Sequence, residues 1–153
     1  MIAKFFIFLF RVNQSLHRLR IISYSFGIIV NIIYRFIGYI IGVDIPWKTK
    51  IGKGFRISHP MGIVIHENTI IGENCWIRQN TTIGIDLRTK DAPIIGDNVN
   101  IGANTCIIGN VKIGDNSIIG AGSVVVKSIP ENSVAVGNPC KVIKNRIVNN
   151  KSI

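Results

Sequence analysis

Residues 101–125, "IGANTCIIGNVKIGDNSIIGAGSVV", place an isoleucine or valine at every sixth position. With the residues just before this stretch, the series reads Ile95, Ile101, Ile107, Ile113, Ile119 and Val125. An α-helix with its period of 3.6 residues does not produce this spacing, and neither does a strand that alternates at every second residue. A fixed period indicates a repeat architecture in which short units stack on one another.

A glycine or an asparagine follows three residues after nine of the apolar positions in the repeat. The positions are Gly54, Asn68, Asn74, Asn80, Asn98, Asn104, Asn110, Asn116 and Gly122. Both residue types tolerate positive φ, so we expect one left-handed turn per hexad. Small or β-branched residues come next: Thr69, Cys75, Thr81, Val99, Thr105, Val111, Ser117 and Ser123. A short β segment, a turn and a small corner residue predict a β-solenoid, with three hexads per coil and roughly five coils between residues 45 and 130.

The period is broken once, near the start of the repeat. An earlier series begins at Ile45, and its step from Ile57 to Ile65 is eight residues long, with His59 inside the step. After this step the six-residue spacing resumes and continues to Ile83.

The length of 153 residues suits a single domain with a sizeable core. The formal net charge is +10, and the excess lies at the two ends: residues 1–50 carry seven Lys or Arg and one acid, and residues 141–153 carry four and none. Basic ends can face anionic lipid, an acidic polymer or water, so charge alone identifies no partner. The three cysteines form no C-x-x-C pair, which favours a reducing cytoplasm.

The N-terminal segment is apolar and basic. The stretch from Ile21 to Val43 is long enough to span a bilayer, but Asn31 and Arg35 interrupt its middle. A narrow polar or small stripe recurs every four residues: Ser23, Gly27, Asn31, Arg35 and Tyr39. We expect a helix that packs on the open end of the solenoid and lies partly in a membrane surface, rather than a true span.

The chain resembles the hexapeptide-repeat acyltransferases, and among them the serine acetyltransferase branch. The matching motifs are "VDIP" at 43–46, "SHPMGIVI" at 58–65, "TTIG" at 81–84, "IGANTCIIGNVKIGDNSIIGAGSVV" at 101–125 and "GNPCKVI" at 137–143. The resemblance implies an all-β core formed by a left-handed parallel β-helix. We therefore predict an N-terminal helical segment at 1–43, the β-helix domain at 44–143 and a C-terminal tail at 144–153.

In that branch, the histidine before the G-I-V motif is the general base, and the resemblance assigns this role to His59. It also assigns to Asp44 the role of orienting that histidine. A base with a pKa near 7 can take the proton of an alcohol as its oxygen attacks the thioester of acetyl-CoA. On this interpretation, the irregular step at residues 57–65 is a loop that leaves the coil and lets His59 face a groove.

The same resemblance implies that acetyl-CoA is the co-substrate. Backbone N–H groups near Gly84 and Ala103 are candidates for contacting its thioester and pantetheine arm, because small residues let the backbone come close. The "GAGS" motif supplies further candidates, namely Gly120, Ala121, Gly122 and Ser123. Lys127 and Lys141 are candidates for its phosphates.

Three departures from serine acetyltransferases concern the acceptor. Those enzymes have an aspartate directly before the catalytic histidine, where this chain has Ser58, and an Arg-His pair before a proline, where it has Asp91 and Ala92. A site without that arginine lacks the planar fork that suits a carboxylate. The chain also resembles the small O-acetyltransferases of exopolysaccharide and capsule synthesis, so we predict a sugar hydroxyl as the acceptor. Serine O-acetyltransferase in cysteine biosynthesis and a non-catalytic hexapeptide binding or assembly module are the alternatives.

Further expectations concern metal, assembly and location. Only His59 and His66 lie in the repeat, too few for the three-histidine zinc site of hydratases on the same fold, so we expect no metal. The resemblance implies a homotrimer, because the active sites of the family lie between neighbouring β-helices. We expect a cytoplasmic protein, with peripheral contact to the inner face of the membrane and no nucleic-acid partner.

Overall fold

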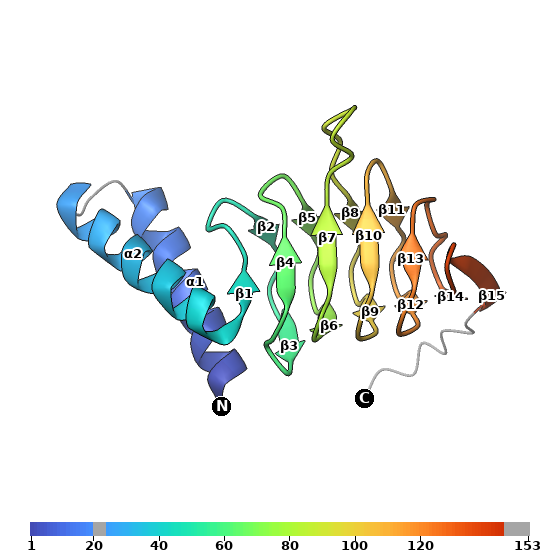
Figure 1. Ribbon diagram of the computed structural model, residues 1–153, viewed down its shortest axis with the longest axis horizontal. Coiled ribbons are helices and arrows are strands. Elements are labelled where there is room, and N and C mark those ends of the chain that lie inside the picture. Colours follow the sequence, from blue (N-terminus) through green and yellow to red (C-terminus); the bar gives the residue numbers. More distant parts are fainter. Residues whose placement is uncertain (20–23, 146–153) are drawn as a thin grey trace.

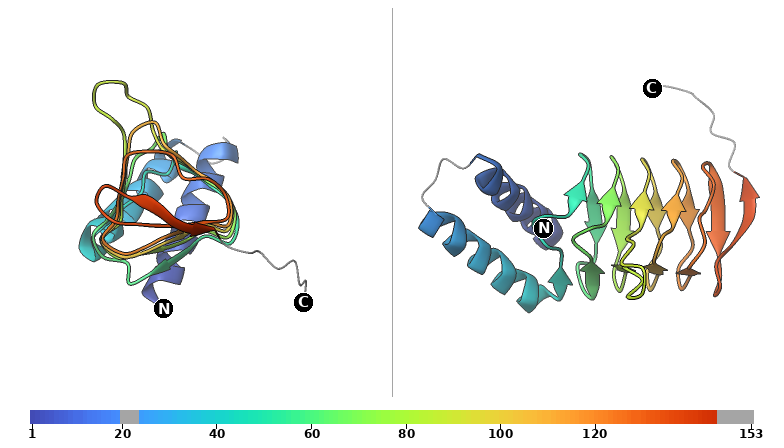
Figure 2. Two further views of the ribbon diagram at one scale, coloured as in Figure 1. Left: turned by 90° about the vertical axis from the view of Figure 1, so that its right-hand side faces the viewer. Right: turned by 90° about the horizontal axis from the view of Figure 1, so that it is seen from above.

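The computed structural model describes residues 1–19 and 24–145, and its main feature is a parallel β-solenoid of about five turns, preceded by two helices. Seen along its axis in Figure 2, the coils superpose as a triangle. The fold is the parallel β-solenoid that the hexapeptide period predicted, and it fits the left-handed β-helix that the resemblance implied. Figure 1 shows the helices at one end of the solenoid and strand β15 (Lys141–Asn145) at the other.

Three sheets form the sides of the triangle, and each coil contributes one short strand to each sheet. Sheet A contains β1 (Val43–Asp44), β4 (Ile63–Ile65), β7 (Thr82–Gly84), β10 (Cys106–Ile108) and β13 (Val124–Val125). Sheet B contains β2 (Lys50–Ile51), β5 (Ile70–Ile71), β8 (Ile94–Ile95) and β11 (Lys112–Ile113). Sheet C contains β3 (Arg56–Ser58), β6 (Trp76–Arg78), β9 (Asn100–Ile101), β12 (Ile118–Ile119), β14 (Ser133–Val136) and β15. The strands described are parallel except β15, which closes sheet C antiparallel to β14.

The apolar residue of each hexad lies in the core, as predicted. Every isoleucine or valine of the two series is buried, and the residues that follow the turns are buried too, down to Thr69, Cys75 and Ser123 at 0% exposure. Successive strand residues point to opposite faces of the sheet, so an isoleucine that points into the core has a neighbour that points outward. The core is therefore a column of β-branched side chains along the solenoid axis.

Two of the three corners of each coil have the predicted left-handed turn. Asparagines at these corners stack and hydrogen bond in columns: Asn80 to Asn104, Asn98 to Asn116, and Asn116 to Asn132. The prediction is wrong for Asn68 and Asn110, which lack positive φ. They belong to the corner between sheets A and B, where Gly109 has the positive φ in one coil and a bond from the Thr69 N–H to the His66 carbonyl closes the turn in another. That corner turns without a left-handed asparagine, so the residue type alone did not reveal its geometry.

Coil length varies at two places. Val64 pairs with Thr82, eighteen residues later, and Cys106 pairs with Val124, again eighteen residues later. Val43 pairs with Ile63, which is twenty residues later, because two additional residues are accommodated around His59. Thr82 pairs with Cys106, twenty-four residues later, because residues 85–92 form a loop that projects from the solenoid between β7 and β8 (Figure 1).

Helices α1 (Ile2–Leu19) and α2 (Tyr24–Ile41) cover the open end of the first coil, as the packing prediction required. Phe6, Phe10 and Tyr34 are buried there, and the Tyr34 hydroxyl donates a 2.6 Å hydrogen bond to the Ile45 carbonyl. Arg11 donates to the carbonyls of Ile51 and Gly52. The end of the core is thus closed by side chains from both helices.

The polar stripe of the N-terminal segment divides between two environments. Asn31 accepts a hydrogen bond from Asn13 of α1, whereas Arg35 and Tyr39 are exposed; Ser23 lies outside the described residues. The outer face of α2 exposes large apolar side chains, among them Ile32, Phe36 and Ile40. Among the helices described, none has the length and apolarity needed to cross a bilayer. Contact with a membrane surface stays a prediction.

The predicted boundaries at 43/44 and 143/144 also stay predictions. Val43 already belongs to β1, and Lys144 and Asn145 belong to β15. Residues 146–153, the rest of the predicted tail, lie outside the described residues.

Candidate functional site

His59 follows strand β3 directly and occupies the corner between sheets C and A. Its backbone has a φ of 54°, and its side chain is exposed. The Met61 N–H donates to the His59 carbonyl, which closes the tight turn that leads into β4. The longer coil therefore presents His59 outside the core, as the irregular period indicated. Positive φ is uncommon for residues other than glycine, although histidine adopts it more often than most, and such positions cluster at functional sites.

Asp44 lies on β1, at the start of the twenty-residue coil that contains His59, and pairs with Val64 of β4. Its side chain is exposed, and no hydrogen bond or ion pair within the described part of the chain joins it to His59. The structure therefore places the two predicted catalytic residues in one coil without a direct contact. Their assignment as a pair stays a prediction.

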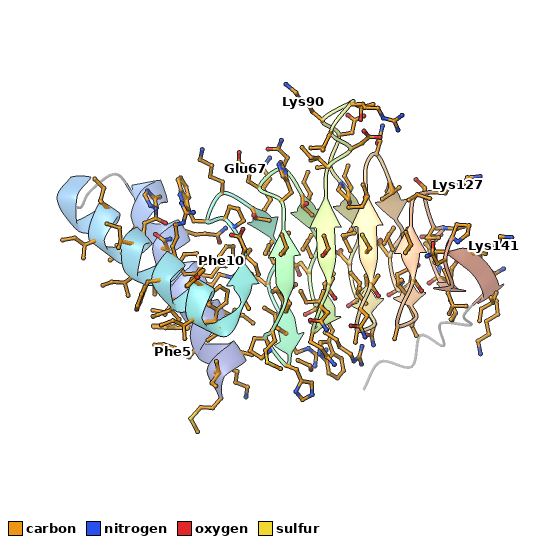
Figure 3. The ribbon with its side chains drawn as sticks, in the orientation of Figure 1. Phe5, Phe10, Glu67, Lys90, Lys127 and Lys141 are labelled. Carbon is orange, nitrogen blue, oxygen red and sulfur yellow. The ribbon has the colours of Figure 1, made fainter. Side chains whose placement is uncertain are left out.

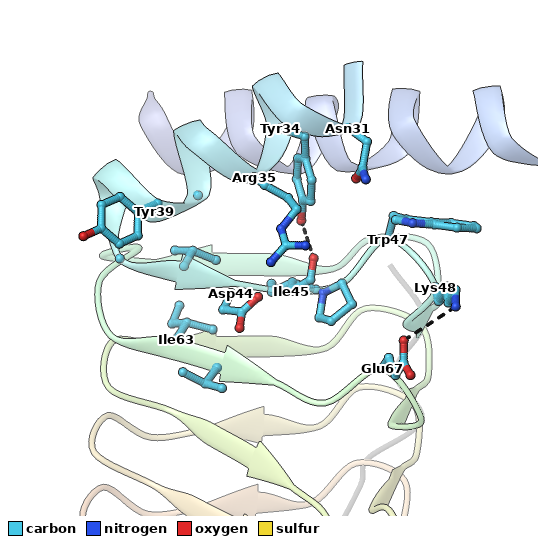
Figure 4. Close-up of a pocket in the computed structure, with 15 residues that line it drawn as sticks. Asn31, Tyr34, Arg35, Tyr39, Asp44, Ile45, Trp47, Lys48, Ile63 and Glu67 are labelled. Carbon is cyan, nitrogen blue, oxygen red and sulfur yellow. Dashed lines mark hydrogen bonds and ion pairs between the residues drawn. The ribbon is translucent and has the colours of Figure 1, made fainter. Parts of the chain in front are cut away.

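Asp44 borders a pocket of about 700 Å³ between α2 and the first two coils, shown in Figure 4. Arg35 and Tyr34 of α2 line one side of it, and Figure 4 shows the Arg35 side chain extending toward β1. Lys48 and Glu67 close one end with an ion pair of 4.0 Å. Burial, and secondarily the charge of Asp44, raises the pKa of Tyr34 well above its ordinary value, so this phenol remains protonated. His59 does not line the pocket.

The residues predicted for the cofactor lie in two places. Ala103 and the Gly120–Ser123 motif occupy successive coils at the same corner as His59, and the Gly122 N–H donates to the Ala103 carbonyl. A side chain at Gly122 would meet no heavy atom within 4 Å, so this corner is open to a ligand. Gly84 is the last residue of β7, whereas Ala103 precedes β10, so the two lie at opposite ends of neighbouring strands of sheet A. The structure does not bring Gly84 and Ala103 together within one chain.

The Ser123 hydroxyl, unlike the other candidate groups of this motif, already has two hydrogen-bond partners within the chain. It donates to the Gly120 carbonyl at 2.7 Å and accepts from the Gly137 N–H at 3.2 Å. The side chain is buried, so its role inside this chain is to hold the corner in shape. Lys127 and Lys141 are exposed and lie at the end of the solenoid remote from the helices, as Figure 3 shows.

The two other positions that depart from serine acetyltransferases, Asp91 and Ala92, lie in the projecting loop. The Lys90 N–H donates to the Asp86 carbonyl, and the Asp86 N–H donates to the Asp91 carbonyl. These backbone hydrogen bonds hold the base of the loop together. Hydrogen bonds from Arg88 hold the pKa of the Asp86 carboxyl below its ordinary value. Lys90 lies at the outer part of the loop (Figure 3).

Sequence reasoning missed a cluster on the outer face of sheet C. Arg56 and Trp76 are paired in the register of β3 and β6, and Ser58 is paired with Arg78. Only the length of the coil could have revealed this cluster in advance, because a coil of twenty residues is what sets Arg56 beside Trp76. Ser58, one of these four residues, directly precedes His59 in the chain.

Comparison with known proteins agrees with the fold. Residues 92–127 match the family described as bacterial transferase hexapeptide (six repeats). Residues 68–90 and 111–145 match the hexapeptide repeat of succinyl-transferase. Together with the β-helix, these matches show that the chain belongs to the hexapeptide-repeat acyltransferases.

Within that class, the similar proteins are serine acetyltransferases. The chain is 48% identical over 103 residues to serine acetyltransferase 3, mitochondrial, of Arabidopsis thaliana, covering 66% of this chain and 26% of that protein. It is 44% identical over 105 residues to serine acetyltransferase of Staphylococcus aureus, covering 67% of this chain and 49% of that protein. A solved structure of serine acetyltransferase in complex with coenzyme A from Brucella abortus superposes with a TM-score of 0.81 and 28% identity, over 94% of this chain and 56% of that one. The chain spans about half the length, or less, of these relatives.

Proposed function

We propose that this protein is an acetyl-CoA-dependent O-acetyltransferase in which His59 is the general base. The observation that carries the proposal is the twenty-residue coil that holds His59 exposed, at positive φ, at the corner shared with Ala103 and Gly122. A buried histidine in a regular coil would have no access to substrates. The relatives add support, because they are acetyltransferases and one was solved with coenzyme A.

The proposed reaction needs few side chains besides His59. The imidazole of His59 takes the proton of the acceptor hydroxyl while the hydroxyl oxygen attacks the thioester carbonyl. The C–S bond breaks, the acetyl group stays on the acceptor oxygen, and the proton returns to the sulfur of the CoA thiolate. The carboxylate of Asp44 stabilises the charge that develops on the imidazole.

The cofactor would run along the corner from His59 toward Lys141. Three strand spacings of about 4.8 Å separate β4 from β13, so this path is roughly 15 Å long. Ala103 and residues 120–122 offer backbone groups along it, and Lys141 lies near its far end for a phosphate group. Lys127 follows β13 and therefore lies at the other end of the strands of sheet A.

The acceptor is the part of the proposal with two candidates. The relatives favour L-serine, which was the alternative to the predicted sugar. The specific observation in favour of a sugar hydroxyl is the set of side chains at positions 58, 91 and 92, which lacks the aspartate and arginine of those enzymes. L-Serine is therefore the first acceptor to test, and a sugar is the second.

We also propose that the working form is a homotrimer. Gly84 and Ala103 lie at opposite ends of neighbouring strands of sheet A, and in the proposed trimer two neighbouring chains would each contribute one of them to a single acetyl-CoA site. Analytical ultracentrifugation would test this assembly.

The experiment is thiol release from acetyl-CoA with L-serine, or with the host's de-acetylated polysaccharide, as acceptor. His59→Asn keeps a residue that tolerates the positive φ and removes the base, so we expect turnover to fall by roughly 10²- to 10⁴-fold. His66→Asn is the matched control, because His66 lies at another corner, in the next coil, and its Nδ1 accepts from the Asn68 N–H. Turnover that survives His59→Asn would disprove the base assignment, and absence of turnover with both acceptors would favour a non-catalytic module.

A further inference from the structure

The outer face of sheet C carries an ordered cluster directly beside His59. Ile57 and Ile77 point into the core, so the residues on either side of them point outward from β3 and β6. The register pairs Arg56 with Trp76 and Ser58 with Arg78. Four side chains from two neighbouring strands therefore share one small area of surface.

Trp76 is the fixed centre of this cluster. Its indole N–H donates a 2.7 Å hydrogen bond to the Ser58 hydroxyl, which holds the ring across the two strands. The guanidinium carbon of Arg56 lies 4.9 Å from the centre of the indole ring, and that of Arg78 lies 4.7 Å away. Both distances are within the range of cation–π attraction. One aromatic ring thus restrains two arginines.

Arg78 is restrained further by a neighbouring strand. Its Nη1 donates to the Asn100 Oδ1 at 2.6 Å and, more weakly, to the Ile101 carbonyl at 3.4 Å. The ion pairs found in the described residues are Lys48–Glu67 and Arg88–Asp86, and neither includes Arg56 or Arg78. Two guanidinium groups are therefore held against one indole ring without an acidic partner from the described part of the chain.

Such an arrangement suits an oxyanion. Two like charges repel each other, and a carboxylate or phosphate bound beside them relieves that repulsion while using their planar donor forks. Aromatic stacking reduces the rotamer freedom that a flexible arginine would otherwise lose on binding. The cluster therefore resembles a preorganised anion site more than a solvated basic surface.

We propose that Arg56 and Arg78, held against Trp76, bind an oxyanion carried by the acceptor, either a carboxylate or a phosphate. This inference rests on the proposed function and specifies its substrate class as a hydroxyl compound with a negative charge. It also gives the chain a substitute for the arginine missing before Pro93, supplied by sheet C instead of the projecting loop. The phosphates of CoA are the less favoured source, because Lys127 and Lys141 lie at the other end of the solenoid.

Binding is tested first, without any need for turnover. The indole N–H resonance of Trp76 in the intact ¹⁵N-labelled protein is followed during titration with sodium acetate, inorganic phosphate, L-serine and the uncharged sugar methyl β-D-glucoside. We expect a saturable shift with the three probes that carry a carboxylate or phosphate group and none with the glucoside. Arg78→Met and Arg56→Gln should each abolish the shift, whereas Lys112→Gln, which removes one charge from sheet B, should leave it intact.

Kinetics then connect the site to the acceptor. KM is compared for L-serine against L-serinamide and for glucuronate or glucose 1-phosphate against glucose, with acetyl-CoA in excess. We expect Arg56→Gln and Arg78→Met to raise KM for the member of each pair that carries the carboxylate or phosphate by about ten- to a hundredfold, with little change for the member without it or for acetyl-CoA. Arg78→Lys keeps the charge without the fork and should recover only part of the loss.

The outcomes separate the two proposals. If the indole resonance of Trp76 does not shift with any anion, the anion site is disproved, whether or not the protein transfers acetyl groups. A KM increase for acetyl-CoA instead of the acceptor would assign the cluster to the cofactor and also contradict the inference. A saturable anion shift with no acetyl transfer to any acceptor would support the site and count against the proposed function.

Discussion

The indole N–H of Trp76 donates a hydrogen bond to the hydroxyl of Ser58, the residue directly before His59. The two residues are eighteen positions apart in the chain but meet on adjacent strands, because β3 and β6 pair in parallel register. This bond links the histidine turn to the arginine pair on sheet C. A change at Ser58 should therefore affect both stability and acceptor binding.

Ser58→Ala leaves the indole N–H without its partner. Because the site is only half-buried, we expect a loss of about 1 kcal/mol in the free energy of unfolding, measured by urea denaturation. If the anion site exists, KM for a charged acceptor should rise as well. Ser15→Ala, at an exposed position of α1, is the control and should change neither quantity. Equal effects of the two variants would show that the Ser58–Trp76 bond has no importance.

Asp44→Asn tests the carboxylate on β1. The amide keeps the size of the side chain and removes the charge that would stabilise a protonated His59, so we expect kcat to fall at least tenfold with KM for acetyl-CoA unchanged. Glu67→Gln, on the rim of the same pocket, removes a similar charge and should leave kcat unchanged. A kcat unaffected by Asp44→Asn would leave the pocket without a role in the chemistry.

Gly102 and Gly122 lie in successive coils and should respond in opposite ways to a side chain. A Cβ on Gly102 would lie 2.7 Å from the Cα of Ala121, so Gly102→Ala should destabilise the protein by about 1–3 kcal/mol. Gly122→Asn should be nearly neutral for folding, because this corner is open and the equivalent Asn104 already has a φ of 56°. Thermal unfolding of the two variants checks this, and a larger loss for Gly122→Asn would contradict the stacking argument.

Arg11 joins the helices to the first coil through the carbonyls of Ile51 and Gly52. Arg11→Met keeps much of the apolar stem and removes these charge-assisted hydrogen bonds, so we expect a loss of about 2 kcal/mol. Lys4→Met removes an exposed charge from the same helix and should cost little. Urea denaturation and the rate of proteolysis within α1 would detect the difference.

Stability above pH 9 should depend on Cys75. Burial raises the pKa of its thiol from 9.0 to about 11. Between these values the unfolded chain releases a proton that the folded protein retains, so folding loses stability as the pH rises, by at most about 1.4 kcal/mol per pH unit. Cys75→Val, which places in this coil the residue type that Val99 provides in the next, should unfold with a smaller pH slope. Equal slopes for the two proteins between pH 9 and pH 11 would contradict the burial argument.

Much of the fold could be predicted because the hexad is a local signal. Each isoleucine of the series became a buried core residue, and the glycine and asparagine corners were correct wherever the turn is left-handed. The exposed position of His59 also followed from the eight-residue step, since two extra residues cannot fit inside a closed coil. The failures at Asn68 and Asn110 came from the one corner whose turn uses different hydrogen bonds.

The candidate site was harder to predict because its residues come from different coils. The helical segment was predicted incompletely, because one helix was expected around residues 21–43 and the structure has two, α1 and α2. Arg11 of α1 and Tyr34 of α2 dock on the first coil. Nor did any motif single out Arg56, Trp76 or Arg78. Their importance depends on contacts with one another, and motif matching considers each segment by itself.

The sequence alone determined the repeating coil, the composition of its core and the point at which His59 leaves it. These properties depend on the spacing of neighbouring residues, which the chain specifies locally. Only the tertiary structure decided which outward-facing residues lie side by side. Coils of eighteen, twenty and twenty-four residues change the partner of each surface position, so Arg56 meets Trp76, and Ser58 meets Arg78, only after the solenoid has closed.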